Sequence, residues 1–269
     1  MGELTVSQIE KRLITKWLGR EYIYWPEIGS TNEWLKQAEQ ADLPHGTVAL
    51  TDYQSAGKGR QGRSWQAPAG SSLLFSSLYH LDWPVAQAGW LTMLAGTAVV
   101  TTLRQQTTVP IGLKWPNDIM IEQNGRWHKM GGMLSESIIN NQRLDRAILG
   151  IGLNINIEPA DLPTTSTPAT SLLAATGQTF DRAELLAQLL FALEAGVEKA
   201  VAGQNPQPVW QDLLITLNQD VVVTYLHEDK PPLLGRAIGT DESGHLLVED
   251  KDGAHHLITA ADVTLRKEH

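Results

Sequence analysis

The spacing of apolar residues changes near residue 218, and this change points to a two-part architecture. Before it, apolar residues at helical spacing alternate with short runs of β-forming residues. After it come short strands separated by turn residues, at Val221–Val223, Gly235–Ile238, Leu246–Val248 and His256–Ile258. Regularly spaced short strands over about 50 residues are typical of a small β-barrel. We therefore expect a domain of mixed helices and strands over residues 1–217 and a small barrel over residues 218–269.

The first part contains patterns of both helix and strand. Apolar residues at helical spacing predict helices over residues 9–18, 87–104, 183–201 and 210–217, with a further helix entered through a polar cap at Ser30-Thr31-Asn32. Runs of β-forming residues predict strands over residues 47–51, 73–81, 111–115, 119–122, 133–139 and 147–157. The segments 55–71 and 158–171 are rich in Gly, Ser, Pro and Thr, so we expect loops there.

Composition narrows the classes of protein to which the chain can belong. Its 269 residues carry a formal net charge of −9, and an acidic chain is a poor nonspecific binder of nucleic acid because phosphates require clustered cations. The absence of cysteine excludes disulfides, thiolate nucleophiles and zinc–thiolate sites. No signal-peptide pattern is found, and no window approaches the roughly 18 consecutive apolar residues of a membrane span. We therefore expect a cytoplasmic protein with no membrane partner.

One segment departs from this acidic background. Residues 55–65 (SAGKGRQGRSW) contain three cations, three glycines and no acidic residue. Glycines let backbone N–H groups approach an anion and the cations neutralise it, so the segment fits a site for a phosphate-bearing intermediate. It is not a P-loop, because the Gly-x4-Gly-Lys-Ser/Thr arrangement is absent. On composition alone, a flexible basic surface turn or an RNA-contacting loop explains the segment equally well.

The same segment resembles the adenylate-binding loop of the biotin–protein ligases, whose pattern is G-[RK]-G-R-x-G-R-x-W. Other motifs match in the family's order: Ser30-Thr31-Asn32, Lys114-Trp115-Pro116-Asn117-Asp118, Lys129-Met130-Gly131-Gly132-Met133-Leu134, Gly150-Ile151-Gly152-Leu153-Asn154-Ile155-Asn156, Ala169-Thr170-Ser171-Leu172 and Thr264-Leu265-Arg266. The resemblance covers residues 25–266. It implies an α+β fold, with a class II synthetase-like mixed sheet and flanking helices followed by an SH3-like barrel. It also implies ATP and biotin as substrates, Mg²⁺ with the ATP, and as partner a biotin carboxyl carrier domain of acetyl-CoA carboxylase or a related enzyme.

Biotin activation joins two anions, the biotin carboxylate and the α-phosphate of ATP. Charge repulsion and orientation are the obstacles, so cations and positioning should supply most of the catalysis. The resemblance implies that Arg60 and Lys129 are catalytic and hold the carboxylate and the developing acyl phosphate. The implied biotin-binding set is Ser30, Thr31, Gln54, Lys58, Arg60, Trp65, Lys129, Gly132, Leu134 and Gly152. The implied ATP- and adenylate-binding set is Gly57, Gly59, Arg60, Arg63, Asn154 and Arg266.

Most of these assignments have a structural alternative. Without the resemblance, Lys129 is best interpreted as a solvated hairpin lysine, and Ser30-Thr31-Asn32 as a helix cap. For Trp65, ordinary core packing is the alternative to lining the tunnel for the valeryl chain of biotin. Asp118 is the candidate for positioning Mg²⁺ or the incoming lysine, although Pro-Asn-Asp is also a common turn composition.

Two other functions compete with a biotin–protein ligase. A lipoate ligase shares the fold and the two-step chemistry, but the basic loop with Trp65 and the C-terminal barrel favour biotin. A non-enzymatic nucleic-acid module would use residues 58–63 and the barrel, and the overall acidity and lack of interleaved aromatics count against it. Some family members also repress transcription through an N-terminal helix-turn-helix domain. About 25 residues precede the first motif, too few for such a domain, so we expect a monofunctional ligase that binds no DNA. A homodimer formed through sheet edges is compatible with the family.

Overall fold

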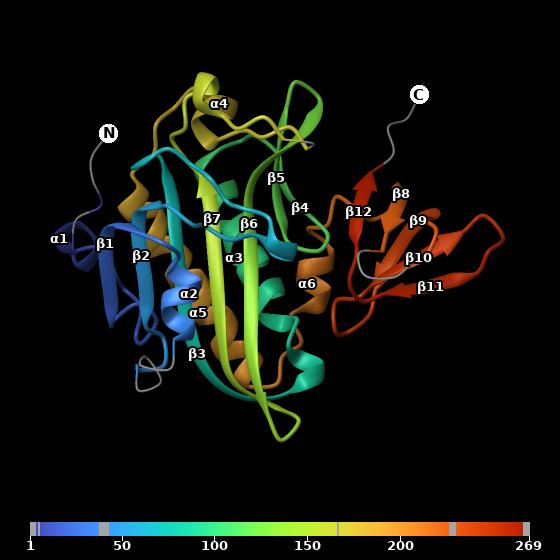
Figure 1. The fold of residues 1–269 in the computed structure, drawn as a ribbon, viewed down its shortest axis with the longest axis horizontal. Coiled ribbons are helices and arrows are strands. Elements are labelled where there is room, and N and C mark those ends of the chain that lie inside the picture. Colours follow the sequence, from blue (N-terminus) through green and yellow to red (C-terminus); the bar gives the residue numbers. More distant parts are fainter. Residues whose placement is uncertain (1–3, 5, 38–42, 166, 226–229, 266–269) are drawn as a thin grey trace.

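A seven-stranded mixed sheet forms the centre of the larger part of the molecule (Figure 1). The computed structural model describes residues 4, 6–37, 43–165, 167–225 and 230–265. The strand order is β1-β2-β3-β7-β6-β5-β4. The strands span Tyr22–Ile28 (β1), Val48–Gln54 (β2), Ser72–Pro84 (β3), Ile111–Lys114 (β4), Asp118–Gln123 (β5), Arg126–Asn140 (β6) and Arg143–Asn154 (β7). β1 and β2 are parallel and the other neighbours are antiparallel, as expected for a mixed sheet.

Helices cover both faces of this sheet. The long helices α3 (Trp90–Gln106) and α5 (Arg182–Val201) pack against each other and bury the main apolar core against one face. The short helix α2 (Thr31–Lys36) lies on the other face, where Leu35 packs with Leu78 and Ile148 in a separate apolar cluster (Figure 1). Three further short helices are α1 (Val6–Glu10), α4 (Leu172–Thr176) and α6 (Gln207–Gln211). No helix of the described chain is long and apolar enough to cross a membrane.

The C-terminal part is a five-stranded antiparallel sheet beside the larger part (Figure 1). Its strand order is β11-β10-β9-β8-β12, with bounds Asp220–Thr224 (β8), Leu233–Thr240 (β9), Leu246–Asp250 (β10), His255–Ile258 (β11) and Asp262–Leu265 (β12). A closed barrel would need β11 to pair with β12. Among the described residues these two strands are instead the sheet edges, so the expected barrel is observed as an open sheet.

The change from one sheet to the other occurs just before β8. Leu113 of β4 donates its N–H to the carbonyl of Leu213 and accepts the N–H of Ile215, both at 2.8 Å, so these residues extend the edge of the large sheet. Asn218 instead donates to the carbonyl of Ala237 in β9, also at 2.8 Å. These bonds agree with a boundary at residue 217, which stays a prediction.

Only residues 9 and 10 of the expected helix over residues 9–18 are helical, at the end of α1. α1 ends at Glu10, and the backbone N–H groups of Lys16, Trp17 and Leu18 donate to the buried carboxylate of Glu194 on α5. A helix would have paired these N–H groups within the segment. A tertiary ion–dipole contact therefore replaces the local structure that the apolar spacing favours.

Strand β1 was not expected from the sequence. It contains Pro26, which lacks an N–H and is confined to sheet edges, and β1 is an edge strand. Its residues are mostly half-buried, so the alternation of apolar and polar residues that identifies a strand is weak.

Candidate active site

A cavity of about 560 Å³ lies beside α2, a volume within the range of small-molecule sites. Its walls come from α2, the basic loop, strands of the large sheet, the loop before α4, and β12 of the C-terminal sheet. The predicted site residues that line it are Ser30, Thr31, Gln54, Lys58, Gly59, Arg60, Arg63, Trp65, Asp118, Lys129, Gly132, Leu134, Gly152 and Asn154. Gly57 lies at the base of the basic loop, and Arg266 lies outside the described residues.

One end of the cavity is lined by neutral polar groups that are already held in place. Thr31 donates its N–H to Gln54 Oε1 at 2.9 Å, and its hydroxyl lies 2.6 Å from Ser76 Oγ. The Ser76 hydroxyl donates to Asn32 Oδ1 at 2.5 Å. Ser30 caps α2 by accepting the N–H of Glu33, as the capping alternative predicted. The cap therefore also fixes two cavity-lining residues in the first turn of the helix.

Glycines of β7 leave room for two side chains above the sheet. A Cβ atom on Gly152 would stand 2.9 Å from the indole of Trp65, and one on Gly150 would stand 2.2 Å from Asn32 Oδ1. Trp65 therefore occupies the space above Gly152 while also lining the cavity. Both interpretations of Trp65, as packing residue and as binding residue, are compatible with this placement.

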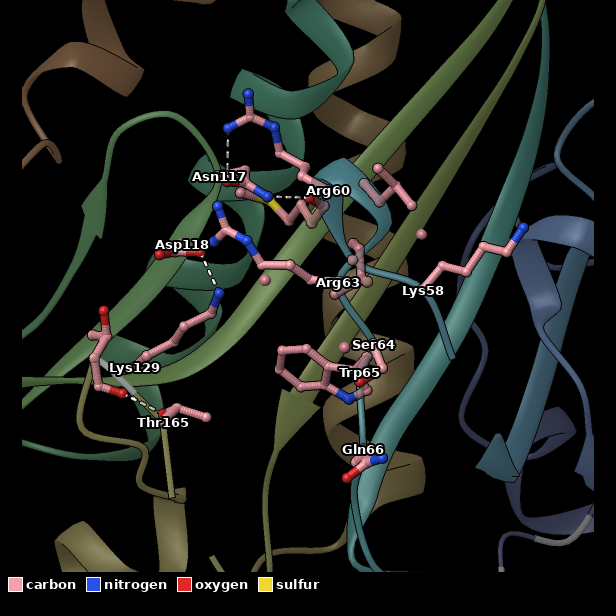
Figure 2. Close-up of a pocket in the computed structure, with 18 of the residues that line it drawn as sticks. Lys58, Arg60, Arg63, Ser64, Trp65, Gln66, Asn117, Asp118, Lys129 and Thr165 are labelled. Carbon is pink, nitrogen blue, oxygen red and sulfur yellow. Dashed lines mark hydrogen bonds and ion pairs between the residues drawn. The ribbon is translucent and has the colours of Figure 1, made fainter. Parts of the chain in front are cut away.

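The two arms of the basic loop approach each other closely at their base. The N–H of Trp65 donates to the carbonyl of Gly57 at 2.8 Å, and the N–H of Gly59 donates to the carbonyl of Arg63 at 2.7 Å. A Cβ atom on Gly57 would lie 2.5 Å from the carbonyl oxygen of Trp65, which explains why glycine is needed there. Lys58 points away from the other cations toward α2, where its ammonium pairs with Glu33 at 2.9 Å (Figure 2).

Cationic side chains gather at the other end of the cavity. Figure 2 shows Arg60, Arg63 and Lys129 extending toward Asn117 and Asp118. Lys129 Nζ lies 2.5 Å from Asp118 Oδ1, and Arg60 Nη1 donates to Asn117 Oδ1 at 3.4 Å. Burial lowers the pKa of Arg60, against the opposing effect of nearby carboxylates, but an arginine remains charged at neutral pH.

Lys129 is fixed at its backbone as well as at its ammonium group. Its N–H donates to the carbonyl of Pro168 at 2.8 Å, and its carbonyl accepts the N–H of Thr170 at 2.9 Å. The loop before α4 therefore pairs with β6 beside the cavity. The side chain is half-buried and paired with Asp118, which argues against a freely solvated hairpin lysine.

Two charged residues of the cavity had no role assigned from the sequence. Lys114 ends β4, and burial lowers its pKa, with Asp118 opposing that effect and Lys129 adding to it. The motif Lys114–Asp118 is a signal that could have identified this lysine. Asp262 begins β12 and pairs with Arg63 from the basic loop. Nothing in the sequence near Asp262 indicates this contact.

The residues around Asp118 do not make up a protein-only metal site. Among the described residues, no group of three or more His, Cys, Asp or Glu side chains could hold a metal ion. Asp118 itself is paired with Lys129. A divalent cation here would therefore need most of its oxygen ligands from another molecule, as Mg²⁺ commonly does with nucleotide phosphates.

Comparisons with known proteins agree over nearly the whole chain. The model of the biotin/lipoate A/B protein ligase family matches residues 24–154, and that of the biotin protein ligase C-terminal domain matches residues 216–266. The bifunctional ligase/repressor BirA of Bacillus subtilis is 32% identical over 98% of this chain and 80% of its own length. The biotin–[acetyl-CoA-carboxylase] ligase of Mycobacterium tuberculosis is 32% identical over 88% of this chain and 86% of its own.

A solved structure supports the same grouping. The biotin protein ligase from Aquifex aeolicus in complex with biotin and ATP is 27% identical, with a TM-score of 0.72 over 93% of this chain and 100% of that one. Sequence and fold thus agree across both sheets, and the chain belongs to the biotin protein ligase family.

Proposed function

We propose that this chain is a biotin–protein ligase that converts biotin and ATP to biotinyl-5'-AMP and then transfers biotin to a lysine of a carrier protein. The observation that carries the proposal is the division of one cavity into a neutral, hydrogen-bonding end and a cationic end. The first end suits the uncharged ureido ring of biotin, and the second suits phosphates and a carboxylate. The match of residues 216–266 to the biotin protein ligase C-terminal domain favours biotin over lipoate.

In the first step, a carboxylate oxygen of biotin bonds to the α-phosphorus of ATP while the bond from that phosphorus to the bridging oxygen breaks. Pyrophosphate leaves with the electron pair of the broken bond. Arg60 and Lys129 neutralise the charge that develops around the reacting phosphoryl group, which is the largest obstacle to joining two anions. Arg63 and Lys114 line the same end of the cavity and would bind the outer phosphates.

Binding of the biotin moiety is assigned to groups that are already ordered. Ser30, Thr31 and Gln54, with the Lys58 backbone, would hydrogen-bond the ureido ring. Trp65, Gly132, Leu134 and Gly152 would surround the valeryl chain. Asn154 Oδ1 is buried without a hydrogen-bond partner among the described residues, so it offers an acceptor to the adenylate. Gly57 and Gly59 shape the loop, and Arg266 is carried over as a phosphate contact by resemblance alone.

The second step requires no nucleophile from this chain. The carrier lysine, once deprotonated, attacks the carbonyl carbon of the mixed anhydride, and the bond to the phosphate oxygen breaks to release AMP. We assign biotin and ATP binding to residues 1–217 and propose a biotin carboxyl carrier domain, such as that of acetyl-CoA carboxylase, as the partner. We place the activity in the cytoplasm, and Mg²⁺ would enter with ATP, near Asp118.

A coupled assay tests the proposal and its two catalytic residues. The parental protein, incubated with labelled ATP, biotin and an apo carrier domain, should form biotinyl-5'-AMP and biotinylated carrier. Replacing Lys129 or Arg60 by Ala should slow adenylate formation by at least about 100-fold, the usual effect of losing a group that stabilises developing charge. Lys199→Ala, on the exposed face of α5, is the control and should match the parent. Adenylation of lipoate in preference to biotin would overturn the assigned substrate, and parental rates in both variants would overturn the assigned residues.

A further inference from the structure

Asp262 brings a carboxylate from the C-terminal sheet into the cationic end of the cavity. It is the first residue of β12, where it pairs in register with Thr224 of β8, and it lines the cavity together with Val263 and Thr264. Its Oδ2 accepts a hydrogen bond from Arg63 Nη2 of the basic loop. The two residues lie 199 positions apart in the chain, so this ion pair joins the two parts of the molecule directly at the site.

The local charges keep Asp262 ionised. Burial by itself raises the pKa of this carboxyl group, but the hydrogen bond from Arg63 and the charges of Arg63, Arg60 and Lys114 lower the pKa below its ordinary value. In turn, the hydrogen bond to Asp262 raises the pKa of Arg63. At neutral pH the contact is therefore a carboxylate–guanidinium pair within a group of cations.

A carboxylate and a phosphate use the same donors on a guanidinium group. Asp262 therefore occupies part of the hydrogen-bonding capacity that Arg63 would offer to a phosphate. The pair is also only partly buried, with side-chain exposures of 57% for Arg63 and 38% for Asp262. Replacing the Asp262 carboxylate on Arg63 by a more highly charged anion therefore costs little free energy, because exposed ion pairs contribute little to stability.

We propose that Asp262 competes with phosphate groups for Arg63, so that it disfavours retention of pyrophosphate once the adenylate has formed. This inference rests on the proposed function. On ATP binding, the outer phosphates displace the carboxylate from Arg63. After the bond at the α-phosphorus breaks and pyrophosphate leaves, Asp262 pairs with Arg63 again and opposes the return of pyrophosphate. Asp262 acts through Arg63 rather than on the reacting atoms, and it sets the preference of Arg63 among anionic ligands.

A different role for Asp262 predicts the opposite sign. If the carboxylate only held Arg63 in the correct place for phosphate, removing it would weaken the binding of pyrophosphate. If it competes, removing it strengthens that binding. The direction of the change therefore separates the two roles, because loss of a purely structural contact does not improve ligand affinity.

The experiment measures product inhibition by inorganic pyrophosphate during biotinyl-5'-AMP formation by the full chain. Asp262→Asn keeps the shape of the side chain and removes its charge. Its inhibition constant for pyrophosphate should fall about two- to fivefold, the range expected when a partly exposed ion pair no longer competes. Asp252→Asn, in the exposed turn between β10 and β11, changes the net charge equally and should leave the constant unchanged.

Two further variants complete the test. Asp262→Ser removes the same charge with a smaller side chain and should shift the constant in the same direction. In an Arg63→Gln background, Asp262→Asn should have no further effect, because the group for which the two anions compete is gone. An unchanged or higher inhibition constant in both Asp262 variants would overturn the inference. If the parental protein formed no biotinyl-5'-AMP, the proposed function itself would fail instead.

Discussion

The position of the Trp65 indole depends on the absence of a Cβ atom at Gly152. The indole lies above the bare backbone of β7, with Lys129 Nζ 6.0 Å from the ring centroid. Gly132, the register neighbour of Gly152 on β6, is less constrained, because a Cβ atom there would stand 3.6 Å from Trp65. Gly152 and Gly132 are neighbours in the sheet, but only Gly152 must lack a Cβ atom for the Trp65 ring to keep its position.

This difference predicts unequal effects of the same substitution. Gly152→Ala would place its methyl group 2.9 Å from the Trp65 ring, so the indole or the strand must shift. Overpacking of this kind costs about 1–3 kcal/mol, which lowers Tm by several degrees in a protein of this size. Gly132→Ala, with ordinary contact distances, should change Tm much less. Thermal unfolding of the two ligand-free variants checks the prediction, and equal Tm values would contradict it.

At the scale of elements, a buried ion pair connects β2, which precedes the basic loop, with β3, which follows it. Asp52 of β2 accepts hydrogen bonds from Arg182 of α5 at 2.6 Å and from the Tyr24 hydroxyl at 2.9 Å. Arg182 also donates to the carbonyl of Ser72, where β3 begins after the loop, at 2.9 Å. The N–H of Gly70 donates to the carbonyl of Asp52 at 3.0 Å. The strand before the loop and the strand after it thus share one polar cluster.

Loss of this buried ion pair should lower the free energy of unfolding far more than loss of an exposed ion pair. Arg182→Gln leaves the Asp52 carboxylate buried without its charge partner, and such losses cost about 3–5 kcal/mol. Arg143, which pairs with the exposed Asp82, provides the matched control, and Arg143→Gln should cost less than about 1 kcal/mol. Urea unfolding of both variants measures the free energies. Similar losses in the two would show that burial of the Asp52–Arg182 pair is unimportant.

At the scale of the whole molecule, the turn between β9 and β10 is one of the segments through which the C-terminal sheet contacts the larger part. The Trp115 indole donates to the carbonyl of Gly244 at 2.9 Å, and the Trp90 indole donates to that of Glu242 at 3.2 Å. Trp115 lies next to Lys114 in the chain, so the contact links a cavity-lining segment to the second sheet. The same placement brings Asp262 to the basic loop.

Removing the Trp115 donor should loosen this contact selectively. In Trp115→Phe the Gly244 carbonyl loses its partner, at a cost of about 1–3 kcal/mol, and amide hydrogen exchange should quicken in residues 241–245 and 262–265. Trp210→Phe is the matched control: the Trp210 indole is also buried near Gly244 but has no hydrogen-bond partner among the described residues. Exchange measured by mass spectrometry should change little in that variant. Equal effects of the two substitutions would show that the hydrogen bond does not hold the sheets together.

Most of the candidate site could be predicted because its motifs are short and local. The loop of residues 55–65 combines glycine and cations within a few positions, and Ser30 precedes a helix as a capping residue does. The errors come from contacts between distant segments. Glu194 accepts the N–H groups that a longer first helix would have paired. β1 lies at the sheet edge and contains Pro26, so its sequence lacks the usual pattern of a strand.

The sequence by itself determined most of the helices and strands, the change to an all-β segment near residue 218, and the cationic, glycine-rich composition of the basic loop. These follow from backbone preferences and side-chain types within a few residues of each other. The tertiary structure decided how the charges are paired. Lys129 meets Asp118 through the register of β5 and β6, and Arg63 meets Asp262 because the second sheet lies against the first. The sequence around a charged residue does not identify its ion-pair partner, so only the packing of the two sheets brings Asp262 to Arg63.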